Sequence, residues 1–108
     1  MNLNFKVASD SMMPLIKIDG LLTVVKKTEN YKIFDIIIFK RSSKLIVHYI
    51  WRNQVDFNQT IITRSLKNIY VDEEPVHKNE IIGVVENYRI GLISKIRIII
   101  FCFIRRAL

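Results

Sequence analysis

The fold of this chain is indicated first by residues 36–51, which read Ile36-Ile37-Ile38-Phe39-Lys40-Arg41-Ser42-Ser43-Lys44-Leu45-Ile46-Val47-His48-Tyr49-Ile50-Trp51. The two apolar runs in this stretch, 36–39 and 45–51, are rich in β-branched and aromatic residues, which favour strands. Similar runs recur at Leu21–Val25, Thr60–Thr63 and Ile81–Val85. Polar segments separate them, and the spacing of roughly ten residues predicts an all-β sandwich or barrel-like sheet rather than βαβ units.

Length and composition limit the classes of protein that this chain can belong to. Its 108 residues suit one domain with one modest core. The single cysteine, Cys102, excludes an intramolecular disulfide and a cysteine-based zinc cluster. The chain has no Gly-rich phosphate loop and no His-Glu-x-x-His motif, so we expect neither a cofactor nor a metal.

Positive charge is concentrated at the end of the chain. The net charge is +7, yet residues 1–88 carry 12 Lys/Arg and 10 Asp/Glu and are close to neutral. Residues 89–108 contain five basic residues and no acid. We therefore divide the chain into a domain over 1–88 and a basic apolar tail over 89–108, and we expect no nucleic acid as a partner.

The tail allows two interpretations. Ile96, Ile99, Ile100 and Phe103 fall at helical spacing among basic residues, which is typical of a short helix lying at a membrane surface. A last strand or a helix docked on the core is equally compatible with the pattern. No signal peptide is visible, and no stretch reaches the roughly 20 apolar residues of a spanning helix. We expect a cytoplasmic protein or one peripherally bound to a membrane through Leu92–Leu108.

Two polar residues stand out as candidates for chemistry. Ser11 lies in the turn-like segment Ser9-Asp10-Ser11-Met12-Met13-Pro14, where a hydroxyl can be exposed, although many such serines are plain turn residues. His48 is the one ionisable residue in the apolar run 45–51. A histidine there is either a hydrogen-bonded core residue or a neutral imidazole that acts as a general base.

Five segments in order resemble the conserved boxes of signal peptidase I. They are Ser9–Pro14 (Ser-Gly-Ser-Met-x-Pro in the family), Ile33–Phe39 (Gly-(Asp/Glu)-Ile-Val-Val-Phe), Ile46–His48, Thr63–Asp72 (Thr-Lys-Gly-Asp-x-Asn…Asp) and Ile81–Val85 (Ile-Ile-Gly-x-Val). The resemblance covers about residues 5–86. Bacterial members carry lysine in the third box, whereas the archaeal and endoplasmic-reticulum type carries histidine.

The resemblance implies a coiled antiparallel sheet of the signal peptidase and LexA type and assigns the catalytic residues. Ser11 matches the nucleophile, His48 the general base and Asp72 the acid that orients the histidine. Ser9 and the Ser11 backbone N–H match the oxyanion hole. The implied function is a serine endopeptidase that removes signal or leader peptides from precursor proteins.

The resemblance also implies how a substrate peptide binds. In the family the peptide adds a strand to the sheet, pairing here with Phe5–Ala8 and with the strand before His48. The residues expected to contact it are Phe5, Val7, Met12, Ile46 and Val47. Small pockets would select small side chains near the cleavage point.

Several positions depart from the family pattern. Asp10 and Phe34 stand where the family has glycine, Tyr49 replaces a common arginine, and Leu66 replaces an acid. Asp19-Gly20 inverts the order Gly-Asp. Two alternative functions follow: an inactive peptide-binding or membrane-associated adaptor of the same fold, or a LexA-like peptidase that cleaves itself.

A second histidine offers a weaker candidate. His77 lies near the acids Asp72, Glu73 and Glu74 and could complete a metal site with them. A solvated acidic turn with His77 in a loop is the better interpretation of this segment.

Overall fold

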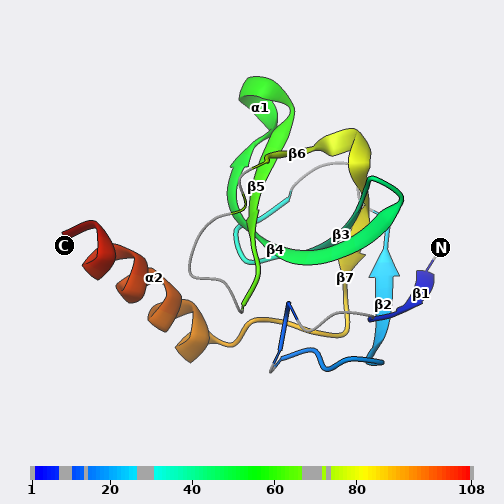
Figure 1. Cartoon of the computed structure of the whole chain (residues 1–108), viewed down its shortest axis with the longest axis horizontal. Helices are drawn as coiled ribbons and strands as arrows, with labels where there is room; N and C mark the ends of the chain where they lie inside the picture. Colours follow the sequence, from blue (N-terminus) through cyan, green and yellow to red (C-terminus); the bar gives the residue numbers. More distant parts are fainter. Residues whose placement is uncertain are drawn as a thin grey trace.

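A computed structural model describes residues 2–7, 11–13, 15–26, 31–66, 72 and 74–107. Its strands form one antiparallel sheet in the order β1-β2-β7-β3-β4-β5-β6 (Figure 1). The elements are β1 (Asn2–Lys6), β2 (Leu21–Val25), β3 (Ile36–Arg41), β4 (Lys44–Gln54), α1 (Val55–Asn58), β5 (Thr60–Arg64), β6 (Val76–His77), the 3₁₀ turn η1 (Lys78–Glu80), β7 (Ile81–Val85) and α2 (Leu92–Ala107).

The predicted all-β class is confirmed. Each of the five apolar runs forms a strand, β2, β3, β4, β5 or β7. The sheet is coiled but not closed: in the described part of the chain β1 and β6 are its two edges. A register shift between Ile50 and Arg52 accompanies the strong curvature of β4 (Figure 1), as bulges do, and a second shift, between Ile38 and Phe39, interrupts the pairing of β3 with β7.

The central strands read as continuous apolar runs because both faces of the sheet are covered. Successive side chains of a strand point to opposite faces. A first core on one face includes Ile36, Ile38, Val47, Tyr49 and Val85, and a second core on the other includes Ile37, Phe39, Ile50, Ile61 and Val76. By this alternation His48 belongs to the second face.

Two tight backbone features shape the sheet near the site. Ser42 and Ser43 both have positive φ, 51° and 66°, and make the two-residue turn between β3 and β4. This geometry matches the twist of paired strands. Gly83 lies in β7 between β2 and β3, where a Cβ would come within 2.6 Å of the Val25 carbonyl oxygen.

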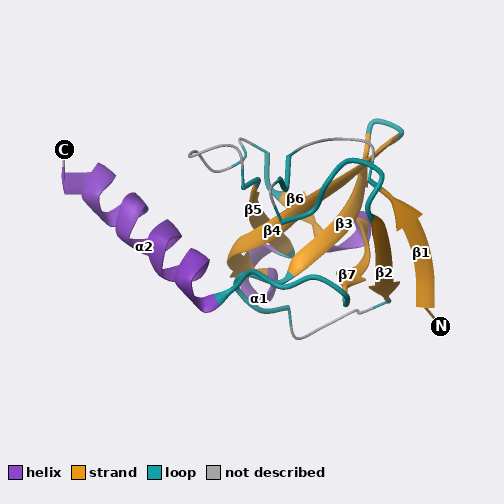
Figure 2. Ribbon diagram, turned by 90° about the horizontal axis from the view of Figure 1, so that it is seen from below, coloured by secondary structure: helices purple, strands orange, loops and turns teal. Residues whose placement is uncertain are grey.

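The tail is a helix, α2, which runs away from the sheet (Figures 1 and 2). Its half-buried Ile98 packs against the first core, while Leu92, Ile93 and Phe103 are at least 70% exposed. Among the described residues, no helix has the length and apolar character needed to cross a bilayer.

Candidate active site

The structure brings His48 and Asp72 into direct contact, although 24 residues separate them in sequence. His48 Nδ1 lies 2.6 Å from Asp72 Oδ2, a distance typical of a short, charge-assisted hydrogen bond. The two side chains are 15% and 21% exposed, so the pair is largely shielded from water but still reachable. The His48 ring also meets the Phe39 ring edge-on, with 6.1 Å between their centroids.

Thr63 holds Asp72 in place from the neighbouring strand. β5 pairs with β4 so that Thr63 lies opposite Ile50, on the same face as His48. The fully buried Thr63 hydroxyl donates to Asp72 Oδ2 at 2.5 Å, and the Thr63 carbonyl accepts from the Asp72 backbone N–H at 2.9 Å. The acid is therefore fixed through both its side chain and its backbone.

These contacts determine the charge of Asp72. Burial by itself raises the pKa of the Asp72 carboxyl, but hydrogen bonds from His48 and Thr63, the attraction of the His48 ring when it is protonated and the positive charge of Arg41 outweigh it, so the pKa is lowered. Asp72 is thus a carboxylate at neutral pH and can only accept hydrogen bonds. The imidazole proton then lies on His48 Nδ1, which leaves the Nε2 lone pair to act as a base.

Ser11 lies in a turn over residues 11–13 that packs against β4. The neighbouring Met12 is buried in the first core and anchors the turn, and its carbonyl accepts from the Ile16 N–H at 2.9 Å. The half-buried Ser11 hydroxyl donates to the carbonyl of Val47 at 3.4 Å, which is long for a hydroxyl donor. Because Val47 directly precedes His48, the serine is held at the segment of β4 that carries the histidine.

The expected substrate-binding residues have different environments. Val7, Met12 and Val47 are buried in the first core, whereas Phe5 and Ile46 are half-buried on opposite faces. The Val7 N–H donates to Gly20 at 3.0 Å and its carbonyl accepts from Asp19 at 2.7 Å. The expected oxyanion residue Ser9, like Asp10, lies outside the described residues.

His77 is a structural residue. Its Nδ1 accepts from the Asn79 N–H at 3.2 Å, and its own N–H donates to the Glu80 carboxylate at 2.8 Å. The two bonds form a capping box at the start of η1. In the part of the chain that the structure describes, no cluster of His, Cys, Asp and Glu side chains is arranged to hold a metal.

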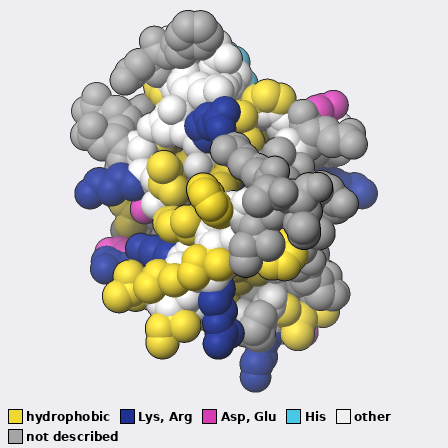
Figure 3. Space-filling view, turned by 90° about the vertical axis from the view of Figure 1, so that its left-hand side faces the viewer, with side chains coloured by type: hydrophobic (Ala, Val, Ile, Leu, Met, Phe, Trp, Pro, Cys, Tyr) yellow, Lys and Arg dark blue, Asp and Glu magenta, His cyan; other side chains and the backbone are white. Residues whose placement is uncertain are grey.

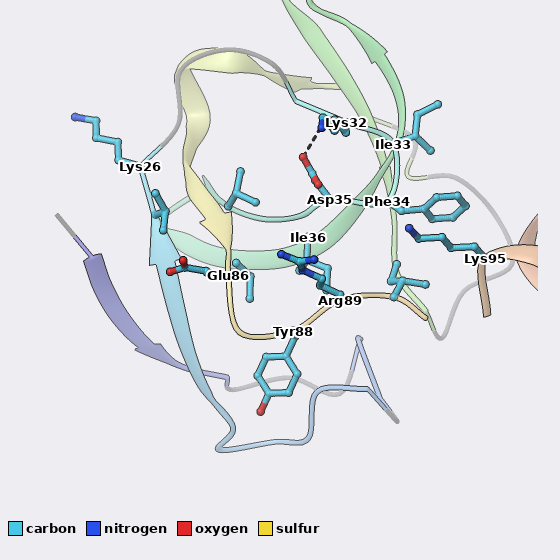
Figure 4. Close-up of a pocket in the computed structure, with 14 residues that line it drawn as sticks. Lys26, Lys32, Ile33, Phe34, Asp35, Ile36, Glu86, Tyr88, Arg89 and Lys95 are labelled. Carbon is cyan, nitrogen blue, oxygen red and sulfur yellow. Dashed lines mark hydrogen bonds between the residues drawn. The ribbon is translucent and has the colours of Figure 1, made fainter. Parts of the chain in front are cut away.

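A separate cavity of about 480 Å³ opens beside the ends of β2 and β7 (Figure 4). Its lining carries charges of both signs, including Lys32, Asp35, Glu86 and Arg89. The Lys32 backbone N–H donates to the Asp35 carboxylate at 2.9 Å, which stabilises the loop at its rim. The cavity shares no lining residue with the serine, histidine and acid described above.

Thr63 and Arg41 are contributors that the sequence analysis did not assign. Thr63 begins the fourth box, and a hydroxyl at the inward position of an apolar strand is the signal that marks it. Arg41 carried no such signal, because its contacts depend on how the chain returns to the end of β3.

Comparisons with known proteins leave the function to be argued from geometry. Neither a protein-family model nor a curated protein matches the chain.

Proposed function

We propose that this protein is a serine peptidase with Ser11 as nucleophile, His48 as general base and Asp72 as the acid that orients the base. The observation that carries the proposal is the 2.6 Å His48–Asp72 bond on the strand that the Ser11 hydroxyl contacts. A half-buried histidine needs a partner in any protein, but an ionised acid at its Nδ1, with a serine hydroxyl at the carbonyl of the preceding residue, supports a catalytic triad. More specifically, we propose a signal-peptidase-like endopeptidase acting on precursor proteins.

The proposed reaction begins when the Ser11 hydroxyl leaves the Val47 carbonyl and reaches His48 Nε2. Its oxygen attacks the scissile carbonyl while its proton passes to His48 Nε2, and Asp72 stabilises the imidazolium. His48 then returns the proton to the leaving amine, and the acyl-enzyme is hydrolysed by a water that His48 deprotonates. The resemblance assigns oxyanion stabilisation to the Ser11 N–H and Ser9.

The substrate peptide would add to the edge of β1. In the described sheet β1 pairs with β2 alone, so its other side is open to a further strand. Val7 directs its N–H and carbonyl inward, and residues alternate along a strand. We therefore expect Lys6 and Asn4 to offer their backbone groups to the peptide, while Phe5 and Val7 shape the adjoining surface.

A cleavage assay tests the proposal directly. The purified protein is incubated with peptides that carry an apolar segment followed by Ala-x-Ala, and products are identified by mass spectrometry. We expect Ser11→Ala and His48→Ala to reduce cleavage by a factor of about 10³ or more. Ser43→Ala is the matched control, because Ser43 is exposed in the β3–β4 turn.

Each alternative gives a different result in this assay. Cleavage that is unchanged in Ser11→Ala contradicts the proposal. Peptide binding that survives in Ser11→Ala and His48→Ala, with no turnover by the native chain, supports the adaptor. A truncated mass for the purified native chain, absent in Ser11→Ala, supports self-cleavage.

We further propose that α2 places the enzyme on an anionic membrane surface. Leu92, Ile96, Ile99 and Phe103 follow one another at spacings of three and four and are all 47–75% exposed, so the outward side of this helix is apolar. Figure 3 shows hydrophobic side chains on this end of the molecule with Lys and Arg beside them.

Charge favours a membrane over a second copy of the chain. The exposed Arg97 follows Ile96, and one residue is 100° of rotation, so a cation flanks the apolar stripe. Such a cation attracts anionic headgroups, whereas two copies of the helix would bring like charges together.

Vesicle sedimentation distinguishes a membrane from a second copy of the chain as the partner of α2. We expect binding to phosphatidylglycerol vesicles, weaker binding to phosphatidylcholine, and at least about a tenfold loss in Ile96→Glu. Ser94→Glu adds the same charge away from the stripe and should bind like the native chain. If the native chain does not bind vesicles but dimerises in the absence of lipid, and Ile96→Glu abolishes that dimerisation, the partner of α2 is a second copy of the chain rather than a membrane.

A further inference from the structure

Arg41 occupies a junction between the candidate site and the chain that follows Asp72. It is the last residue of β3, directly before the two-residue turn to β4, and its side chain is 22% exposed. Its Nη1 donates to the Glu74 carbonyl at 3.3 Å, and its Nη2 donates to the Pro75 carbonyl at 2.9 Å. One guanidinium thus bonds to two successive backbone carbonyls just beyond Asp72.

The same guanidinium reaches toward the histidine through an aromatic ring. Its carbon lies 5.4 Å from the centroid of Phe39, and the Phe39 ring meets the His48 ring edge-on. The positive charge of Arg41 also contributes to the lowered pKa of Asp72. Arg41 therefore contacts Phe39, which packs against His48, and the backbone that follows Asp72.

Neutralisation of surface acids does not account for this arrangement. The ion pairs of Arg41 with Glu74 and Glu80 are 3.7 Å and 3.6 Å long, and the Glu74 side chain is 77% exposed. Pairs of this kind contribute little to stability. Hydrogen bonds to two carbonyls instead require the planar, forked donor of an arginine.

We propose that Arg41 is a positioning residue, which clamps the segment after Asp72 so that the carboxylate faces His48. Asp72 lies outside the described strands, and Thr63 on β5 bonds to both its carboxylate and its backbone N–H. The clamp adds a second attachment by tying Glu74 and Pro75 to the end of β3. The consequence for catalysis rests on the proposed peptidase function, whereas the structural effect does not.

The test compares Arg41→Gln and Arg41→Lys with the native chain by NMR in the absence of substrate. The two readouts are the titration of the Asp72 carboxyl and the downfield proton shared between His48 Nδ1 and Asp72. In Arg41→Gln we expect the Asp72 pKa to rise toward its ordinary value and the shared-proton signal to broaden or vanish. Arg52→Gln removes the same charge from an exposed position on β4 and should change neither.

Arg41→Lys separates the clamp from simple charge. Lysine keeps the charge but cannot donate to both carbonyls in a fixed geometry, so we expect it to restore part of the Asp72 titration and little of the shared-proton signal. Full restoration of both would overturn the clamp. So would an Arg41→Gln spectrum identical to the native one in a chain that unfolds normally.

Kinetics distinguish this inference from the function on which it rests. With a cleavable peptide we expect Arg41→Gln to lower kcat by about 10- to 100-fold with KM within about twofold, because only the orientation of the base is disturbed. A native chain without peptidase activity but with the NMR response refutes the function and keeps the clamp. If the native chain is active and Arg41→Gln changes neither kcat nor the NMR spectra, the clamp is refuted and the peptidase function stands.

Discussion

Removing the Thr63 hydroxyl gives the most quantitative test of the candidate site. Thr63→Val keeps the shape of the fully buried side chain and deletes one hydrogen bond, the 2.5 Å contact to Asp72 Oδ2. The backbone bond between the Thr63 carbonyl and the Asp72 N–H is unaffected by the change. The variant therefore reports on the charged acceptor rather than on the position of the segment.

The expected cost depends on whether Asp72 is ionised. A hydrogen bond to a charged group contributes about 1.5–3 kcal/mol to the free energy of unfolding, and one between neutral groups about 0.5–1.5 kcal/mol. Thr63→Val should thus cost about 2 kcal/mol at neutral pH and roughly 1 kcal/mol less once the carboxyl is protonated. The His48 bond, which the variant retains, prevents a larger loss.

The lowered pKa of Asp72 determines how the free energy of unfolding changes with pH. A carboxyl whose pKa is lower in the folded state stabilises the fold above its unfolded pKa of about 3.9, and this contribution disappears as the pH falls through the folded pKa. Removing a donor raises the folded pKa, so Thr63→Val loses the contribution at a higher pH than the native chain.

Urea unfolding of both chains between pH 7 and a pH at which the Asp72 carboxyl is protonated in the folded state measures the difference. Thr60→Val is the control on the same strand, because the Thr60 hydroxyl donates to the side chain of Asn58 at the exposed end of β5. We expect its cost to be smaller and independent of pH. A Thr63→Val cost that is the same at both ends of the range would refute the assignment of an ionised, hydrogen-bonded Asp72.

Three further predictions address the site and its frame. Asp72→Asn should lower kcat by about 10⁴, measured with the cleavable peptide, because the amide no longer fixes the reactive imidazole tautomer. Gly83→Ala should destabilise the fold by about 2–3 kcal/mol in urea unfolding, since a Cβ there meets backbone at 2.6 Å, whereas Gly91→Ala, with open space around it, should be close to neutral. Phe34→Gly should be more stable than Phe34→Ala by about 1 kcal/mol in thermal unfolding, because φ is 74° at this position. Equal stability of those two variants would show that the positive φ costs nothing.

The strands were predictable because hydrophobic pattern and residue type agree over most of the sheet. The run 36–39 begins at the same residue as β3, and Leu21–Val25 and Ile81–Val85 coincide with β2 and β7. The two-residue β6 lies in a polar segment that was expected to be a loop, and it forms because Val76 fills a fully buried place beside Ile61. A strand made by one buried side chain leaves no periodic signal.

The candidate site was predictable only in part, for a related reason. His48 stood out as a polar residue within an apolar run, and its juxtaposition with Asp72 was expected only through the resemblance. The contacts of Thr63 and Arg41 depend on long-range pairing, since β5 must lie beside β4 and the segment after Asp72 must return to the end of β3. Local sequence carries the type of such residues but not their partners.

Two of the departures from the signal peptidase pattern, at Phe34 and Asp19, fall where glycine has a backbone role. Phe34 and Asp19 both adopt positive φ, 74° and 67°, at positions where the pattern has glycine. For a bulky residue this costs about 1–2 kcal/mol. The Phe34 ring stacks on the Tyr49 ring with 5.8 Å between centroids, and Lys95 Nζ lies 5.5 Å from the Phe34 centroid in a cation–π contact. Each contact contributes about 0.5–1.5 kcal/mol, and together they offset the strain.

These contacts keep the departure at Phe34 apart from the proposed chemistry. Phe34 packs on the first core, whereas His48 lies on the opposite face of β4. A phenylalanine in place of glycine at position 34 adds backbone strain to the turn and a contact between Lys95 of α2 and the Phe34 ring. It does not touch the His48–Asp72 hydrogen bond. The resemblance is therefore weakened in its motif at position 34 without a matching change in the site. The proposed activity depends instead on the turn that carries Ser11, where Asp10 adds a negative charge next to the proposed nucleophile in sequence. Asp10→Gly should accordingly raise kcat if that charge opposes the developing oxyanion, and an unchanged kcat would show that the carboxylate points away from it.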